Sequence, residues 1–289
     1  MILVTGATGS IGRHLVRLLR QRQAPFKALV RNPARGRELG GEYVVADFDR
    51  PDSLQAAMSG IDRLFLLSAG AEPTSGRQPM VAQQVAAIDA AARAGVRTVV
   101  KVSVQGASRS GKLASGAHWS IEQHLEASGL DWSILQPSGF MQNFRTGAGT
   151  FTAEGDIIGA YGDGRVPYID CRDIAACAAA LLTEYRDSAQ RFVLTGPEAL
   201  SHTDIAARLS AAYGRTISYV DLPPAQLAAR LTAQGLPAQF AEDVAELQAG
   251  IAEGTAAHIT SAVSDLTGRG PRTFGQFLAD HQPATAEPH

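Results

Sequence analysis

The sequence has few cysteines and no long apolar run. Its only two cysteines, Cys171 and Cys177, are too few for a disulfide framework, and their spacing fits neither a redox pair nor a zinc site. We therefore expect reduced thiols in a cytoplasmic protein without a metal. No apolar stretch is long enough to cross a bilayer. The first apolar segment starts at Ile2, which leaves no room for a signal peptide.

An excess of charge of either sign is also missing. The chain has 26 Lys and Arg residues against 28 Asp and Glu residues, a formal net charge of −2. This balance gives no indication of nucleic acid or an anionic membrane as a partner. A hydrophobic content of 45% in 289 residues is typical of a globular protein with a sizeable core, in one large domain or two small ones.

The N-terminal stretch carries the most specific motif. The apolar run Ile2–Val4 predicts a buried strand, Gly6, Gly9 and Gly12 follow it, and an apolar pattern at helical spacing begins at Ile11. A strand, a glycine turn and a helix form the context of a dinucleotide-binding fingerprint. The first glycine allows a sharp turn, the second leaves room for a pyrophosphate, and the third lets the helix pack close to the strand. The alternative is an ordinary tight turn.

The turn after the second predicted strand indicates whether the dinucleotide is NAD or NADP. Arg31 lies 19 residues after Gly12, where an NAD site usually has a carboxylate that binds the ribose 2′-OH. A guanidinium instead pairs with a 2′-phosphate in a forked geometry. We therefore expect NADP(H), with Arg35 assisting. The alternative is that both arginines are solvated loop residues.

Further apolar runs alternate with helical patterns. This alternation predicts an α/β fold with a Rossmann-type, doubly wound parallel sheet, whose ligand lies beyond the carboxyl ends of the strands. One run, Thr98–Val102, is nearly all apolar and should be central and covered on both faces. The strands after the first are expected at Phe26–Val30, Tyr43–Ala46, Arg63–Leu67, Thr98–Val102, Trp132–Leu135 and Phe192–Leu194.

Several local patterns give expectations for the remaining chain. Asp52 and Asp173 are expected to cap helices over 53–58 and 174–182. Residues 156–163 look like a short hairpin, and segments 203–213, 224–233 and 237–253 are predicted to be helical. A longer helix that ends at Gly95 should bury the stripe formed by Val81, Val85, Ile88 and Ala92.

These patterns suggest a division of the chain. We expect an NADP-binding domain over 1–150, completed by about 165–196, and a small, mostly helical substrate cap over about 197–281 that packs over the carboxyl edge of the sheet. Residues 282–289 should form a poorly ordered tail.

Candidate site residues lie in the turns that follow the predicted strands. The loop after Pro137 has two aromatic rings and polar amides that could cover a nicotinamide or line a substrate pocket; the alternative is a packed surface loop. Its substrate candidates are Phe140, Gln142, Asn143 and Phe144. The cofactor candidates are Gly6, Thr8, Gly9, Ser10, Ile11, Gly12, Arg31, Asn32, Arg35, Asp47, Phe48, Ser68, Ala69, Ser103, His118, Pro137, Gly139 and Phe140.

Four stretches together resemble the NmrA-like atypical short-chain dehydrogenase/reductases. They are Ile2–Gly12, Val30–Pro33, Glu122–Leu125 with Ser128–Leu130, and Pro137–Phe144. The resemblance covers about the first 200 residues well and the helical cap in outline. It implies a fold and a cofactor, NADP(H), but not one activity, because the family includes quinone and dye reductases as well as NADP-sensing regulators.

The resemblance also sets a register for the catalytic residues. In extended members the catalytic lysine is followed by Glu four residues later and by Leu seven residues later. Glu122 and Leu125 set this register, which puts His118 at the lysine position and Ala114 at the tyrosine position. The resemblance therefore implies that the Tyr-x-x-x-Lys pair is absent. Ser103 matches the place where such enzymes keep Ser or Thr.

A missing tyrosine has a chemical meaning. Reduction of a ketone creates a strongly basic alkoxide and demands a proton donor, whereas a quinone, a dye cation or another conjugated acceptor gives a far weaker base or a neutral product. His118 could supply a proton as an imidazolium, since an unperturbed imidazole titrates near pH 6.5. It could instead only hold the ribose hydroxyls, or merely start a helix. His124, six residues on, should lie on a different, surface face.

We therefore favour an NADPH-dependent reductase of a conjugated electrophile, with a small aromatic or conjugated molecule as substrate and His118 and Ser103 as catalytic candidates. An alternative from a different class is a non-catalytic NADP(H) sensor that binds a regulatory protein. A third hypothesis is a biosynthetic imine or enone reductase. A homodimer is one candidate assembly, and the sequence does not fix the oligomeric state.

Overall fold

The computed structural model describes residues 1–74, 76–146, 151–184 and 189–281, and these form two compact units. The first unit comprises Met1–Pro137, Cys171–Leu194 and Ala262–Arg269. The second comprises Ser138–Asp170, Thr195–Ser261 and the residues from Gly270 onward. The expected tail, 282–289, lies outside the described residues. None of the helices in the described ranges is long and apolar enough to span a membrane.

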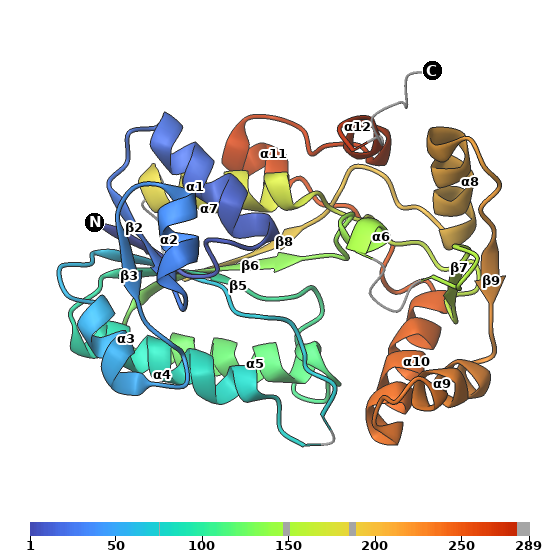
Figure 1. The fold of residues 1–289 in the computed structure, drawn as a ribbon, viewed down its shortest axis with the longest axis horizontal. Coiled ribbons are helices and arrows are strands. Elements are labelled where there is room, and N and C mark those ends of the chain that lie inside the picture. The colour runs from blue at the N-terminus through green and yellow to red at the C-terminus, as the bar shows by residue number, and fades with distance from the viewer. Residues whose placement is uncertain (75, 147–150, 185–188, 282–289) are drawn as a thin grey trace. The chain divides into compact units, whose positions relative to one another are not determined.

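The first unit is built on one parallel sheet of seven strands in the order β3-β2-β1-β4-β5-β6-β8 (Figure 1). Every neighbouring pair is parallel, which confirms the predicted doubly wound sheet. The strand order reverses between β1 and β4, and ligands of such folds bind beside that point. The strands are β1 (Ile2–Val4), β2 (Phe26–Val30), β3 (Tyr43–Val45), β4 (Arg63–Leu66), β5 (Thr98–Val102), β6 (Asp131–Pro137) and β8 (Gln190–Leu194).

Helices cover both faces of this sheet (Figure 1). One face carries α3 (Pro51–Ala57), α4 (Pro79–Arg93) and α5 (Ala114–Glu126). The other face carries α1 (Ser10–Gln21) and α7 (Cys171–Thr183), which pack against each other, with α11 (Ala262–Thr267) beside α7. The short α2 (Pro33–Leu39) follows β2. Coverage on both faces explains the apolar side chains that dominate the inner strands β1 and β4.

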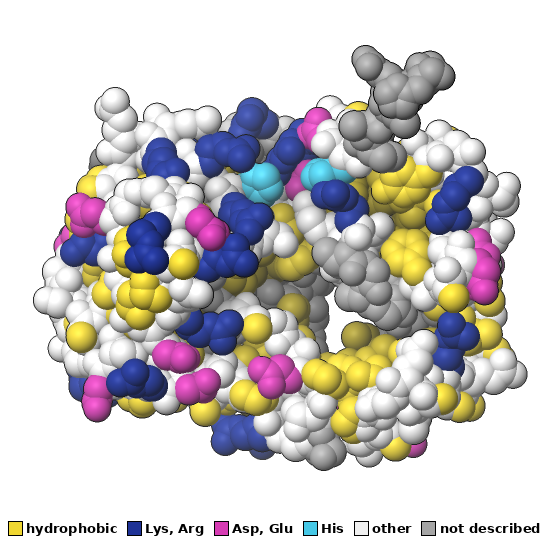
Figure 2. All heavy atoms as spheres, viewed as in Figure 1, with side chains coloured by type: hydrophobic (Ala, Val, Ile, Leu, Met, Phe, Trp, Pro, Cys, Tyr) yellow, Lys and Arg dark blue, Asp and Glu magenta, His cyan; other side chains and the backbone are white. Residues whose placement is uncertain are grey.

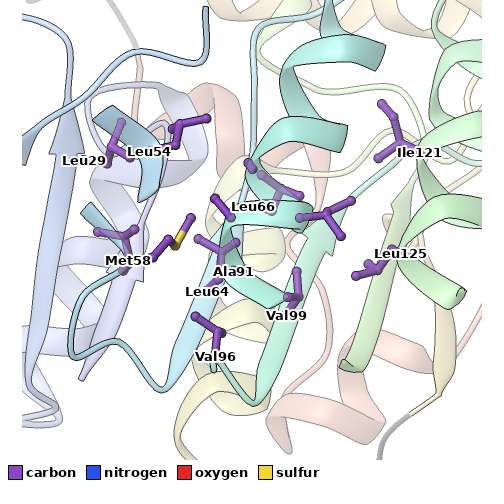
Figure 3. Packing of buried hydrophobic residues seen from close by; sticks show 14 of the residues in the cluster. Leu29, Leu54, Met58, Leu64, Leu66, Ala91, Val96, Val99, Ile121 and Leu125 are labelled. Atoms are coloured by element: carbon purple, nitrogen blue, oxygen red, sulfur yellow. The ribbon is translucent and has the colours of Figure 1, made fainter. Parts of the chain in front are cut away.

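The core beneath α3, α4 and α5 holds the strands at fixed positions. Leu64 and Leu66 of β4 and Val99 of β5 meet Ile121 and Leu125 of α5 in one continuous cluster (Figure 3). Each of these side chains is fully buried. Burial of one such side chain contributes about 1.5–3 kcal/mol, so the strand ends that carry the site are rigid.

The second unit is mostly helical. Its larger core gathers aromatic rings such as Phe144, Tyr168 and Phe274, and its smaller core lies where α9 packs on α10. A two-stranded sheet of β7 and β9 joins the helices. The elements are α6 (Asn143–Thr146), β7 (Ile157–Gly159), α8 (His202–Tyr213), β9 (Tyr219–Asp221), α9 (Pro224–Ala233), α10 (Ala238–Ala252) and α12 (Phe274–Ala279).

The hairpin expected over 156–163 is wrong. Ile157 pairs with Tyr219, so β7 lies parallel to β9, and the local antiparallel pairing is an isolated bridge between Phe151 and Ile157, before the expected hairpin. Parallel strands need a long connection, and here α7, β8 and α8 lie between β7 and β9 in the chain. The local glycines therefore mark a loop and not a hairpin turn.

The two expected aspartate caps are also wrong. α3 begins at Pro51 with Arg50 as its N-cap, and α7 begins at Cys171, so Asp52 and Asp173 lie inside the first turns. Proline is favoured at the first helical position, and a carboxylate in the first turn interacts with the helix dipole as favourably as one at the cap.

The stripe expected on the longer helix needs one correction. Ala92 of α4 is exposed, and the neighbouring Ala91 is buried in its place together with Val81 and Ile88. Gly95, which follows the helix, has a φ of +75°, in the left-handed region that glycine favours at helix ends.

Candidate functional site

The glycine turn after β1 has one open side and one closed side. Gly6 has a φ of +62°, a conformation that glycine adopts without strain. A Cβ on Gly12 would lie 2.1 Å from the Gly6 carbonyl oxygen, so α1 packs directly on the turn. Gly9 is exposed, caps α1, and a Cβ there would meet only the Gly6 oxygen, at 3.3 Å. Gly6 and Gly12 therefore shape the turn, whereas Gly9 faces open space.

Thr5 ties this turn to the end of β4. Its backbone N–H donates to the Phe65 carbonyl at 3.1 Å, and its Oγ1 accepts the Leu67 N–H at 2.8 Å. The turn therefore lies at the point where the strand order reverses. Beyond it, Thr8 is half-buried, Ser10 is exposed and Ile11 is buried. The first N–H groups of α1 follow from this turn, and a helix start of this kind binds phosphate.

Arg31 is an unpartnered cation at the end of β2. Its guanidinium is exposed and has no hydrogen-bond or ion-pair partner among the described residues. Its neighbours are occupied. Asn32 caps α2 by accepting the Ala34 N–H at 2.8 Å, and Arg35 forms an exposed ion pair with Glu38 at 2.9 Å. Lys and Arg side chains gather over the face that α1 and α2 occupy (Figure 2), which makes this region attractive to an anion.

The turns after β3 and β4 hold four more candidates. The Asp47 N–H donates to Ser53 Oγ at 3.0 Å, and Phe48 packs against the main core, so this turn is anchored on α3. Ser68 accepts Gln84 Nε2 at 2.6 Å, and Ala69 is exposed.

Gln84 itself is incompletely satisfied. It is fully buried, yet its Oε1 has no hydrogen-bond partner in the described part of the chain. A buried acceptor without a donor is costly and usually has a water or ligand partner. An orphaned acceptor beside Ser68 fits a ligand hydroxyl at this strand end. The open side at Gly9, the free Arg31 and this acceptor all suit a phosphorylated dinucleotide.

A buried polar network lies at the end of β5. Lys101 is fully buried; its Nζ donates to the Val102 carbonyl at 3.0 Å and lies 2.8 Å from His118 Nδ1. An ammonium has no lone pair, so a protonated Lys101 must donate and Nδ1 must accept. The ring proton of His118 then lies on Nε2. Lys101 thereby fixes the tautomer of His118.

Glu122 forms the second half of the network. Its carboxylate, 2% exposed, accepts hydrogen bonds from the Ser103 hydroxyl, from Gln136 Nε2 at 3.0 and 3.2 Å, and from Arg191 Nε at 3.2 Å. Arg191 also pairs with Glu126. Well-satisfied networks of this kind hold their members rigidly.

Burial decides which group in the network titrates near neutrality. Desolvation lowers the pKa of Lys101 to about 7, although the negative charge of Glu122 opposes the shift. Desolvation, and then the positive charge of Lys101, lower the pKa of His118 to about 2. His118 is therefore a neutral imidazole at pH 7, and the proton that exchanges near neutral pH belongs to Lys101.

The beginning of the loop after β6 is held by main-chain hydrogen bonds in the second unit. The Ile169 N–H donates to the Gly139 carbonyl at 2.9 Å, and Phe140 bridges to Ile169. A Cβ on Gly139 would lie 2.4 Å from Tyr168 Cε1, so this backbone packs directly on the ring. Pro137, the last residue of β6, is buried in the first unit.

The rest of this loop is partly core. Phe144 is 3% exposed, meets Tyr168 edge-on at 4.8 Å and contacts Phe274, as expected for a packed loop. Gln142 Nε2 donates to the Asp170 carboxylate at 2.8 Å. Asn143 is exposed. Phe144 is thus a core residue of the second unit, and Asn143 is the member of this set that presents its side chain to solvent.

The structure places the two catalytic candidates in separate hydrogen-bonded groups on β5 and α5, His118 with Lys101 and Ser103 with Glu122, and adds Lys101, which sequence reasoning missed. The sequence held a signal for it: a lysine inside an apolar strand, two residues before Ser103 and therefore on the same face. His124 lies apart from this network, with its Nε2 2.7 Å from Asp89. Among the described residues, no cluster of His, Cys, Asp and Glu could hold a metal ion.

Comparisons with known proteins identify the family of the chain. The model of the NmrA-like family matches residues 1–278. The chain is 38% identical to an NAD(P)H azoreductase of Xenophilus azovorans, over 98% of this chain and 99% of that protein. It is 33% identical to a (4-alkanoyl-5-oxo-2,5-dihydrofuran-3-yl)methyl phosphate reductase of Streptomyces griseus, over 99% of both.

A solved structure shows the same fold. It is an NADPH-dependent quinone oxidoreductase of Escherichia coli in complex with NADPH, with a TM-score of 0.84 and 28% identity, and the match covers 97% of this chain and 99% of that one. Together with the family match over nearly the whole length, this likeness identifies the fold and its lineage. The chain belongs to the NmrA-like family.

Proposed function

We propose that this chain is an NADPH-dependent reductase that delivers a hydride to a conjugated electrophile. The observation that carries the proposal is the open glycine turn at the switch point of the sheet, next to an arginine that has no partner among the described residues. The relatives support it, because an azoreductase, a dihydrofuranone phosphate reductase and a quinone oxidoreductase are all named for reducing conjugated compounds.

The residues of the first unit suit the parts of NADPH. The open side at Gly9 and the first N–H groups of α1 would bind the pyrophosphate, and Arg31 would pair with the 2′-phosphate. Asp47 and Phe48 would lie beside the adenine, and Ser68 would approach a ribose. When bound, the dinucleotide supplies the hydride.

The Nε2–H of His118 points to a role for this ring as a donor. Lys101 holds the neutral tautomer whose free N–H can bind a ribose hydroxyl or the reduced acceptor. The resemblance implies that Ala114 stands where a catalytic tyrosine would, and we infer that the proton donor that a ketone needs is missing. A conjugated acceptor tolerates this loss, because its reduced form is a much weaker base.

A screen of NADPH oxidation tests the proposal. We expect turnover with a quinone, an azo dye or an enone, and poor turnover with a simple ketone. The Gly9→Val variant, which should no longer bind NADPH, serves as the control. Intact NADPH binding without turnover of any acceptor would favour a non-catalytic NADP(H) sensor instead. Absence of NADPH binding would refute the whole assignment.

A further inference from the structure

We propose that Lys101 is a positioning residue that stores the proton for the reduction and passes it to the acceptor through His118. This inference rests on the proposed reductase function and deepens it. Lys101 lies behind His118: its Nζ contacts Nδ1, and the opposite ring nitrogen, Nε2, remains to donate. In this arrangement His118 can accept a proton at Nδ1 and release one from Nε2.

The burial of Lys101 needs such an explanation. A fully buried ammonium is costly, and an apolar side chain of similar size would usually be neutral or stabilising at such a position. In the described part of the chain, neither hydrogen-bond partner of Nζ is a carboxylate: one is the Val102 carbonyl and the other is His118. The lysine therefore does not serve a buried ion pair, and its one side-chain partner is a catalytic candidate.

The charged groups around Lys101 are few. α5 contributes His118 and Glu122, and β8 contributes Arg191, which is bound to Glu122. β6 contributes only the neutral Gln136 to this network.

The remaining neighbours add little charge. On β5 itself, Ser103 faces the same side. From α4, Asp89 is bound to His124 near the surface, and the buried Gln84 is neutral. Glu122 is therefore the main charge that tunes Lys101, and it does so without a direct hydrogen bond.

The proton transfers balance without a charged histidine. Hydride transfer to a quinone gives a hydroquinone monoanion. This anion takes the proton from His118 Nε2, while His118 Nδ1 takes a proton from the Lys101 ammonium. His118 begins and ends neutral, with its ring proton moved from Nε2 to Nδ1, and Lys101 becomes a neutral amine. His118 Nε2 then takes a proton from water while Nδ1 returns its proton to the Lys101 amine, which restores the starting state.

The surroundings favour this coupled transfer over a simple histidine acid. An imidazolium at His118 is opposed by burial and by the neighbouring ammonium, which hold the pKa of His118 near 2. A His118 ring that accepts a proton at Nδ1 while it donates one from Nε2 never becomes an imidazolium. Lys101 can supply the proton at neutral pH because burial has lowered its pKa to about 7.

The first test needs no turnover. The whole protein is labelled with 15N-histidine, and the ring nitrogens of His118, assigned with His118→Gln, are followed by NMR from pH 5 to 9. We expect the Nε2–H tautomer at low pH and a shift with a midpoint near 7 as Lys101 loses its proton. In Lys101→Met this midpoint should vanish. A wild-type ring that becomes an imidazolium near pH 6.5, or that does not respond near 7, would overturn the coupling.

The second test is the pH profile of kcat with a quinone. Wild-type kcat should fall as pH rises through about 7, because Lys101 loses the proton that the reduction needs. Lys101→Met should lower kcat about tenfold below pH 7 and abolish this alkaline decrease in kcat. Lys27→Met, a lysine change in another strand, should keep the wild-type profile. A limb near pH 7 that persists in Lys101→Met would refute the role of Lys101.

The two tests separate this inference from the proposed function. A wild-type protein without turnover overturns the reductase proposal, and the proton role with it. The NMR titration would in that case still show whether Lys101 sets the tautomer of His118. Turnover with a flat wild-type profile and no NMR midpoint would keep the reductase and reject the relay.

Discussion

Arg31 is the side chain on which the choice between the two dinucleotides depends. It is exposed and has no partner within the described ranges, so no interaction must be broken before it binds a 2′-phosphate. We expect NADPH to bind at least tenfold more tightly than NADH, about 1.4 kcal/mol. Arg31→Ala should remove most of this difference by weakening NADPH alone, as isothermal calorimetry would show. Arg17→Ala, an exposed arginine on α1, is the matched control. Equal losses for both cofactors would contradict the assignment.

Gly9 and Gly12 should respond differently to the same kind of change. Gly9 has an extended backbone and an added Cβ meets only one atom, at 3.3 Å, so Gly9→Val should keep the fold and lose dinucleotide binding. A Cβ on Gly12 would lie 2.1 Å from the Gly6 oxygen and 2.7 Å from Ala7 Cα, so Gly12→Ala should destabilise the first unit by about 1–3 kcal/mol or more. Thermal melts and NADPH titrations of both variants separate the two roles. A Gly9→Val protein with wild-type affinity would show that the dinucleotide binds elsewhere.

At the scale of elements, β5, α5 and β8 contribute the charged side chains of Lys101, Glu122 and Arg191. The Glu122 charge raises the pKa of Lys101 against the effect of burial, so Glu122→Gln should lower the Lys101 pKa below its wild-type value of about 7. The alkaline limb of the kcat profile should move to lower pH. Glu126→Gln, which removes the other partner of Arg191, should move it much less. A limb that moves to higher pH in Glu122→Gln would contradict the assigned sign.

The elements also show which features a sequence can predict. The strands of the parallel sheet were predicted within two residues at either end, because each is a short apolar run followed by a turn and a helix. The β7–β9 pair was missed because its partners lie about sixty residues apart, and pattern reasoning sees only local turns. Lys101 was missed for a related reason. The strand of Lys101 is mostly apolar in sequence. The proposed role of the lysine depends on its contact with His118, which lies on a different element.

At the scale of the whole molecule, the candidate residues divide between two units. The glycine turn, Arg31 and the Lys101–His118 pair all belong to the first unit, whereas Asn143 and Phe144 belong to the second. The first group follows from the order of strands and glycines, which the sequence itself displays. The relatives differ in the compounds they are named for, although they share the family.

The stability of the first unit should depend on pH through Lys101. In the unfolded chain a lysine stays protonated up to its ordinary pKa of 10.5, whereas in the folded chain Lys101 loses its proton near 7. Between these values the unfolded state binds more protons, so the free energy of unfolding should rise with pH, with a slope approaching about 1.4 kcal/mol per pH unit. The window from pH 7 to 9 is best, because above it the tyrosines of the unfolded chain begin to ionise and the unfolded Cys177 thiol, whose folded pKa burial raises to about 12, increasingly opposes the rise.

Tryptophan fluorescence can follow this unit alone, since Trp119 and Trp132 both belong to it. Urea unfolding of the wild type should become harder from pH 7 to 9, and unfolding of Lys101→Met should change little over the same range. Both proteins should lose stability as pH falls below 6.5, because the unfolded His118 side chain takes up a proton that the folded one refuses. This acid loss is an internal control for the folded state of the variant. A rise from pH 7 to 9 of equal size in both proteins would show that Lys101 is charged throughout that range, and the lysine could then not serve as the proton store.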